Sequence, residues 1–169
     1  MAKTEIHQYS VQEKLNKMDV DLIDVEPTVD TSAYAAGDLM FQPIEVTNAV
    51  AVQGGTAILQ SISVANDDAL TGGFDIIFTT SDDSPGALNA AVSGTSGLSD
   101  ANADKILGIT SINNMVDVGA CSIGSKANIG LILKAESDST SVYAWGIAQS
   151  TDNPTTATGY KLRIGVVKD

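Results

Sequence analysis

The sequence has no lysine or arginine between Lys17 and Lys105. Fourteen aspartate and glutamate side chains fall in that interval, and the whole chain has a net charge of −12. An acidic surface repels nucleic acid and anionic lipid, because binding either would bring like charges together. The interval also offers no cation that could hold a phosphate or a carboxylate. We therefore expect neither a nucleic-acid partner nor a membrane partner.

Cysteine and histidine occur once each, as Cys121 and His7. A single cysteine excludes a scaffold held by intramolecular disulfides. Cys121 lies among small and apolar residues, which predicts a buried small side chain. Zinc sites and Ser-His or Cys-His nucleophiles need clusters of these residues, so we expect no enzyme, no catalytic residue, no metal and no cofactor.

Nucleotide-binding motifs and membrane spans are also missing. Residues 119–126 place Gly-Ser-Lys where a phosphate-binding loop requires Gly-Lys followed by Ser or Thr. No apolar run reaches the length of about 18 residues that a membrane span needs. Residues 1–5 lack the apolar region of a signal peptide. We expect a soluble protein made in a cytoplasm.

Carboxylates are the most plentiful charged groups, and three pairs are close in sequence: Asp19 with Asp21, Asp67 with Asp68, and Asp82 with Asp83. They fall in turns or at alternating strand positions, which predicts a solvated surface rather than an acid–base pair. The last two pairs could hold calcium at loop tips, but the spacing of an EF-hand does not occur.

Residues 1–18 differ from the rest of the chain in charge and pattern. Val11, Leu15 and Met18 fall on one helical stripe, and Ser10 and Glu13 have the spacing of a capping box. The segment is either a short helix or arm that docks to a partner, or an extension packed on its own domain. The candidate docking residues are Lys3, His7, Val11, Lys14, Leu15, Lys17 and Met18.

From Val20 onward the pattern is that of short β-strands. The expected strands include 20–25, 39–46, 56–64, 74–78, 115–123, 129–134, 141–149 and 160–167. The apolar phase changes between Leu22 and Ile23, which predicts a bulge or a strand that changes faces. Pro43 predicts an edge strand or a break. Ile58 and Ile62 are expected to share one face of their strand.

The remaining segments are predicted to be loops and one brief helix. Residues 80–97 are rich in Ser, Asp, Gly and Ala, which predicts a long surface loop with a contact or a function. A helix near 99–107 would begin at Ser99 or Asp100 and stop at Gly108. The strand 141–149 is expected to pair with the strand before it, across a turn at 136–139.

About nine short strands and one helix predict an all-β, mainly antiparallel fold. We expect a β-sandwich or jelly-roll-like domain over residues 19–169, preceded by the arm at 1–18. Tyr143 and Trp145 share one strand face and could form a platform on which a sugar stacks. Their alternation with small residues favours a place in the core instead.

Five segments resemble a family of small structural proteins encoded beside the major capsid gene of tailed bacteriophages, particularly marine ones. They are 31–41 (TSAYAAGDLMF), 54–62 (GGTAILQSI), 100–108 (DANADKILG), 126–134 (KANIGLILK) and 159–165 (GYKLRIG). The resemblance runs from about residue 19 to the C-terminus and implies a head decoration or cement protein. Such a protein binds the major capsid protein on the outer capsid surface, often as a trimer, after synthesis in the bacterial host cytoplasm.

Two other functions stay open from the sequence. One is a different virion component, such as a head fibre or a tail protein, and the other is a carbohydrate-binding β-sandwich. The cations gather at the two ends of the chain, which predicts an acidic, water-facing part separated in space from a differently charged docking part.

Overall fold

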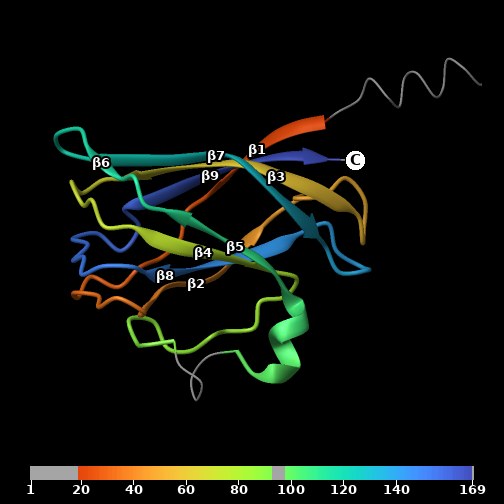
Figure 1. Cartoon of the computed structure of the whole chain (residues 1–169), viewed down its shortest axis with the longest axis horizontal. Helices are drawn as coiled ribbons and strands as arrows, with labels where there is room; N and C mark the ends of the chain where they lie inside the picture. The colour runs from red at the N-terminus through yellow and green to blue at the C-terminus, as the bar shows by residue number, and fades with distance from the viewer. Residues whose placement is uncertain (1–18, 93–97, 169) are drawn as a thin grey trace, which may run out of the picture.

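The computed structural model describes residues 19–92 and 98–168, which form a sandwich of two antiparallel sheets. The strands are β1 (Asp19–Val25), β2 (Leu39–Val46), β3 (Thr56–Asn66), β4 (Phe74–Thr79), β5 (Ile106–Ile112), β6 (Val116–Asp117), β7 (Ser122–Lys134), β8 (Val142–Ala148) and β9 (Tyr160–Lys168). One sheet has the order β1-β9-β3-β7-β6 and the other β2-β8-β4-β5. Figure 1 shows them as two facing layers. The all-β sandwich prediction is confirmed.

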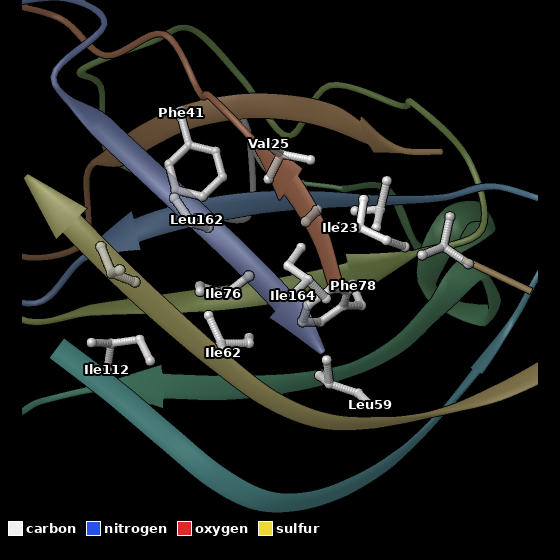
Figure 2. Packing of buried hydrophobic residues seen from close by; sticks show 14 of the residues in the cluster. Ile23, Val25, Phe41, Leu59, Ile62, Ile76, Phe78, Ile112, Leu162 and Ile164 are labelled. Carbon is white, nitrogen blue, oxygen red and sulfur yellow. The ribbon is translucent and has the colours of Figure 1, made fainter. Parts of the chain in front are cut away.

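The core lies between the two layers and is built from the inward side chains of both sheets. In β9, the even-numbered residues from Tyr160 to Val166 are buried, as their period-2 alternation predicts. Figure 2 shows side chains of both sheets meeting in the middle, among them Leu162 and Ile164 from β9 and Ile76 and Phe78 from β4. The five-stranded sheet therefore has one face in the core and one face outside it.

The chain that follows β4 covers the part of the outer face of the four-stranded sheet that surrounds Trp145. Leu39, Ile77 and Trp145 form a second buried cluster there, and Val92 and Leu98 pack against it. Backbone hydrogen bonds fix this cover, because the Leu39 amide donates to Ala90 O at 2.9 Å and the Asn89 amide donates to Leu39 O at 2.9 Å. Figure 1 shows residues 80–92 of this segment beyond the four-stranded sheet.

Two predictions about strand faces are wrong, for related reasons. The pairing of β1 with β9 runs without a shift, so β1 has no bulge. It carries apolar residues on both faces, with Leu22 outward and Ile23 inward. The bulge lies in β3 instead, where the register shifts between Leu59 and Ser61. This extra residue turns Ile62 into the core while Ile58 stays outward.

The prediction for Pro43 is confirmed, since β2 is an edge strand with register shifts near that residue. The helix is shorter than predicted: a 3₁₀-helix, η1, spans Asp100–Lys105, and β5 begins at Ile106. Gly108 therefore lies inside a strand, opposite Phe78, rather than at a helix end.

Two predictions about strand pairing are also wrong. Residues 115–123 contain a hairpin from β6 into β7, not one strand. The strand β8 does not pair with β7 before it but crosses to the other sheet, between β2 and β4. The small residues Ala144 and Ala148 of β8 then face the core, while Trp145 faces the second cluster.

Candidate functional site on the outer face of the five-stranded sheet

The predicted docking residues Lys3, His7, Val11, Lys14, Leu15, Lys17 and Met18 lie outside the described part of the chain. The sandwich itself presents a second candidate surface. It is the outer face of the five-stranded sheet, where apolar and charged side chains are arranged in rows across the strands.

The first part of this surface is an apolar row of four side chains: Val20, Val167, Ile58 and Ile132. The register of the antiparallel pairs places them directly opposite one another on β1, β9, β3 and β7. Val20 is 66% exposed, Ile58 45% and Ile132 62%. Adjacent exposed β-branched residues of this kind mark an interaction surface more often than scattered single ones.

Leu22 extends the apolar row toward the middle of the sheet. It pairs with Gly165, and its Cδ2 atom lies 3.4 Å from the place where a Cβ on Gly165 would be. A side chain at position 165 would also collide with the Ser61 hydroxyl. The glycine thus leaves room for Leu22 to lie over the sheet, which adds apolar area beside Val167.

The second part of the surface is a groove of about 750 Å³ at the other end of the same sheet. Exposed Val116 and Ile123 form an apolar side of the groove, and Ser63 and Ser125 line its floor. The register places Ile123, Ala65 and Lys161 in one line across β7, β3 and β9. The groove therefore offers both apolar contacts and hydrogen-bonding groups.

Two ion pairs form the charged side of the groove. Arg163 Nε donates to Asp24 Oδ1 at 2.8 Å and Arg163 Nη2 to Asp24 Oδ2 at 3.4 Å, while Lys161 Nζ lies 3.8 Å from Glu26 Oε1. The hydrogen bond from Arg163 lowers the pKa of the Asp24 carboxyl below its usual value, which favours the ionised form that the arginine contacts. The two-pronged contact fixes the only arginine of the chain in one orientation.

The predicted separation of acidic and basic regions is wrong within the described residues. Four cations pair with acids from the stretch that lacks lysine and arginine: Lys105 with Asp83, Lys161 with Glu26, Arg163 with Asp24, and Lys168 with Asp21. Three of these pairs arise because β1 lies antiparallel to β9. Sequence distance thus hid the fact that the N-terminal acids and C-terminal cations share a sheet.

The two aromatic residues proposed as a sugar platform do not form one. Trp145 is 4% exposed and lies under the segment that covers the four-stranded sheet. Tyr143 is half-buried, and desolvation raises the pKa of its phenol. A buried indole cannot stack on a sugar, so the core interpretation of Trp145 is confirmed.

The carboxylate pairs considered for calcium lie at opposite ends of β4 and have protein partners. Asp68 accepts a hydrogen bond from the Thr155 amide at 2.8 Å, and Asp83 pairs with Lys105 at 2.7 Å. Across residues 19–92 and 98–168, no group of three or more His, Cys, Asp or Glu side chains is placed to hold a metal ion.

The remaining sequence candidates lie in the hairpin between β6 and β7. Residues 119–126 form its turn and the start of β7, without a helix to bind phosphate. Cys121 is half-buried in that turn, so the prediction of a buried cysteine is wrong.

None of the helices in the described part of the chain is long and apolar enough to cross a membrane.

No family model matches the sequence, and no curated protein is detectably similar to it. The apolar row and the groove were not identified from the sequence. The sequence did contain a signal for this surface, because the segment that forms β1 has apolar residues on both faces. In addition, Ile123 is odd-numbered and Ile132 even-numbered in one long strand, so simple alternation cannot put both in the core.

Proposed function

We propose that this chain is a non-enzymatic virion structural protein, a decoration or cement protein that binds the outside of a tailed-phage capsid. One observation carries the proposal: the outer face of the five-stranded sheet combines exposed apolar side chains with a groove edged by ion pairs. An apolar centre with a polar rim is the usual anatomy of a protein–protein interface. The family resemblance of the sequence supplies the partner, the major capsid protein.

The charge of the chain supports the outer rather than the inner surface of the shell. Packaged DNA would repel a protein with a net charge of −12. The proposed location is therefore the outer capsid surface, reached after synthesis in the bacterial host cytoplasm. The proposal includes a homo-oligomer, with a trimer favoured by the resemblance, and no nucleic-acid or membrane partner.

The arrangement of the sandwich favours the five-stranded sheet as the contact surface. The chain after β4 covers the middle of the outer face of the four-stranded sheet, where it buries Leu39 and Trp145 and leaves Ile109 on β5 exposed. The groove on the opposite sheet leaves Val116 and Ile123 exposed. Burial of these two side chains against a capsid subunit would remove apolar surface from water and so favour binding.

The test uses purified capsids that lack this protein. They would be mixed with the wild-type chain, with Ile123→Glu in the groove, and with Ile109→Glu as the matched control. Ile109 is an exposed isoleucine of β5, on the other sheet. Sedimentation followed by gel analysis would measure the bound copies, and heating of the particles would measure shell stability.

We expect the wild-type chain and Ile109→Glu to bind the capsids and to raise the temperature at which the shell opens. Ile123→Glu should weaken binding at least about tenfold, because it places a charge on the apolar side of the groove. Failure of the wild-type chain to bind the capsids would refute the decoration function. Equal binding of both variants would refute the groove as its contact surface.

The N-terminal docking residues are tested separately. Deletion of residues 2–18 should weaken capsid binding if Lys14, Lys17 and their neighbours contact the shell. Unchanged occupancy of the truncated chain on the same capsids would contradict that role.

Other virion roles would show a different stoichiometry. A head fibre or tail protein would be present in far fewer copies per particle than a protein that coats the shell, and quantitative mass spectrometry of particles measures this number. A carbohydrate-binding role, which cannot use the buried Trp145, would instead appear as specific binding on a glycan array.

A further inference from the structure

The apolar row lies at the end of the five-stranded sheet where the chain enters β1. Val20 is the second residue of that strand, and the row continues from it across β9 and β3 to Ile132 on β7. Within residues 19–92 and 98–168, Val20, Ile58 and Ile132 remain exposed. A continuous apolar surface across four strands, in a protein with a net charge of −12, calls for a cover.

We propose that the N-terminal segment of the same chain covers the apolar row, with Val11, Leu15 and Met18 in contact with it. The chain before Asp19 reaches the sheet at this point, two residues from the first member of the row. A segment tethered so close has an effective concentration in the millimolar range. It therefore competes well against any partner that must arrive from solution.

The length of the segment fits the length of the row. Neighbouring strands lie about 4.8 Å apart, so four side chains on four strands span about 14 Å. In a helix with a rise of about 1.5 Å per residue, Val11 and Met18 lie about 10 Å apart. The three apolar residues of the stripe can therefore lie along most of the length of the row. The remaining distance to the last residue of the row is short enough for one side chain to bridge.

Charge favours this occupant over a second copy of the protein. Residues 1–18 hold three basic and two acidic side chains, whereas residues 19–169 hold nineteen acidic and six basic ones. Two sandwiches packed face to face would bring two strongly acidic bodies together, which costs energy at low salt. The N-terminal segment brings a net positive charge to an acidic body instead.

This inference concerns the isolated protein and does not depend on a capsid. It also places the predicted docking segment and the groove on one side of the molecule. A capsid subunit could then contact both, and failure of either proposal would leave the other intact.

Cysteine cross-linking of the full chain tests the contact directly. In a Cys121→Ser background, Leu15→Cys is combined with Ile58→Cys in the row, or with Ile109→Cys on β5 as the matched exposed control. Glu13→Cys with Ile58→Cys tests the opposite side of the predicted helix. Mass spectrometry under non-reducing conditions detects the disulfide, and dilution separates bonds within a chain from bonds between chains.

We expect an intramolecular disulfide for Leu15→Cys with Ile58→Cys, at a rate that does not change on dilution and that exceeds both controls by at least about tenfold. Cross-links between chains would overturn the proposal in favour of a second copy. If Leu15→Cys formed a disulfide with Ile58→Cys and with Ile109→Cys at equal rates, the proposal would be overturned, because the segment would have no fixed contact.

Limited proteolysis provides a second test without new cysteines. Trypsin cleaves after Lys14 and Lys17, so the rate of loss of the N-terminal peptide reports how well the segment is covered. Ile58→Asp should raise this rate several-fold, and Ile109→Asp should leave it unchanged. The same rate in the wild-type chain and in Ile58→Asp would contradict the proposed contact.

Discussion

Lys168 Nζ lies 2.8 Å from Asp21 Oδ2, so an ion pair joins the last strand of the five-stranded sheet to the first. The lysine side chain is 7% exposed and the aspartate side chain 47%. The hydrogen bond from Lys168 lowers the pKa of the Asp21 carboxyl below its usual value of 3.8. A nearly buried ammonium group with one carboxylate partner makes the pair sensitive to loss of that partner.

The first prediction concerns the pH dependence of this pair. Because the pKa of Asp21 is lower in the folded state, its contribution to stability is present above pH 3.8 and is lost as pH falls below that value. Asp21→Asn should lower the free energy of unfolding by about 1 kcal/mol at neutral pH, since the carboxylate is half-exposed. Urea titrations should show that the difference from the wild-type chain shrinks as the pH falls below 3.8.

Asp138→Asn is the control, because it removes an exposed carboxylate from the turn between β7 and β8. It should change stability little at either pH. A difference between Asp21→Asn and the wild-type chain that persists in strong acid would mean that the ion pair is not its cause.

The second prediction tests the register of β3 with two isoleucines of the same strand. Ile62 is fully buried, while Ile58 is 45% exposed on the outer face. Ile62→Ala should therefore lower the free energy of unfolding by about 2–5 kcal/mol, because it leaves a cavity in the core. Ile58→Ala should cost about 1 kcal/mol or less by the same measurement. Similar losses at both positions would contradict the bulge between them.

Ile58 and Ile62 also show where the periodicity of the sequence no longer predicts which face of a strand is buried. Strict alternation puts Ile58 and Ile62 on one face, and nothing in the sequence GGTAILQSI marks Gln60 as an additional residue. The bulge follows from tertiary contacts, since β3 must match β7 on one side and β9 on the other. By contrast, β9 alternates without interruption, and its buried face was predicted residue by residue.

The candidate site could not be predicted because it depends on which strands are neighbours. Composition showed that acids dominate the first part of the chain, but the pairing of β1 with β9 decides that Asp24 meets Arg163. In the same way, the apolar row requires the registers of three strand pairs. The sequence alone permits many registers, and long-range packing selects one of them.

The third prediction uses Trp145 as a probe of the segment that covers the four-stranded sheet. Trp145 is the only tryptophan of the chain and lies beneath Val92 and Leu98. Its fluorescence should be blue-shifted and poorly quenched by acrylamide in the folded protein. Leu98→Asp should raise the quenching constant several-fold, because a charge at this position disfavours the packed cover. Ile132→Asp, at an exposed site of β7 on the other sheet, should leave quenching unchanged.

Efficient quenching in the wild-type protein would contradict burial of the indole. Equal quenching in Leu98→Asp and the wild-type protein would show that the cover holds Trp145 without this leucine.

The last prediction concerns alkaline stability and Tyr34. Its hydroxyl donates to Met40 O at 2.9 Å and accepts from the Asp30 amide at 2.6 Å. Burial raises the pKa of this phenol from 10.0 to about 12. Ionisation is therefore easier in the unfolded chain, so stability should fall as pH rises from 10 toward 12.

Tyr34→Phe separates the two roles of this residue. At neutral pH it should lower the free energy of unfolding by about 1–3 kcal/mol, because the buried Met40 carbonyl loses its donor. Between pH 10 and 12 its stability should fall less steeply than that of the wild-type chain, because one buried phenol no longer ionises on unfolding. Urea titrations at each pH give both quantities, and tyrosinate absorbance should appear together with unfolding.

Parallel curves of stability against pH for the two proteins would contradict the raised pKa of Tyr34. Tyr143→Phe is the control, because this tyrosine is only half-buried, and it should alter the slope of the curve less.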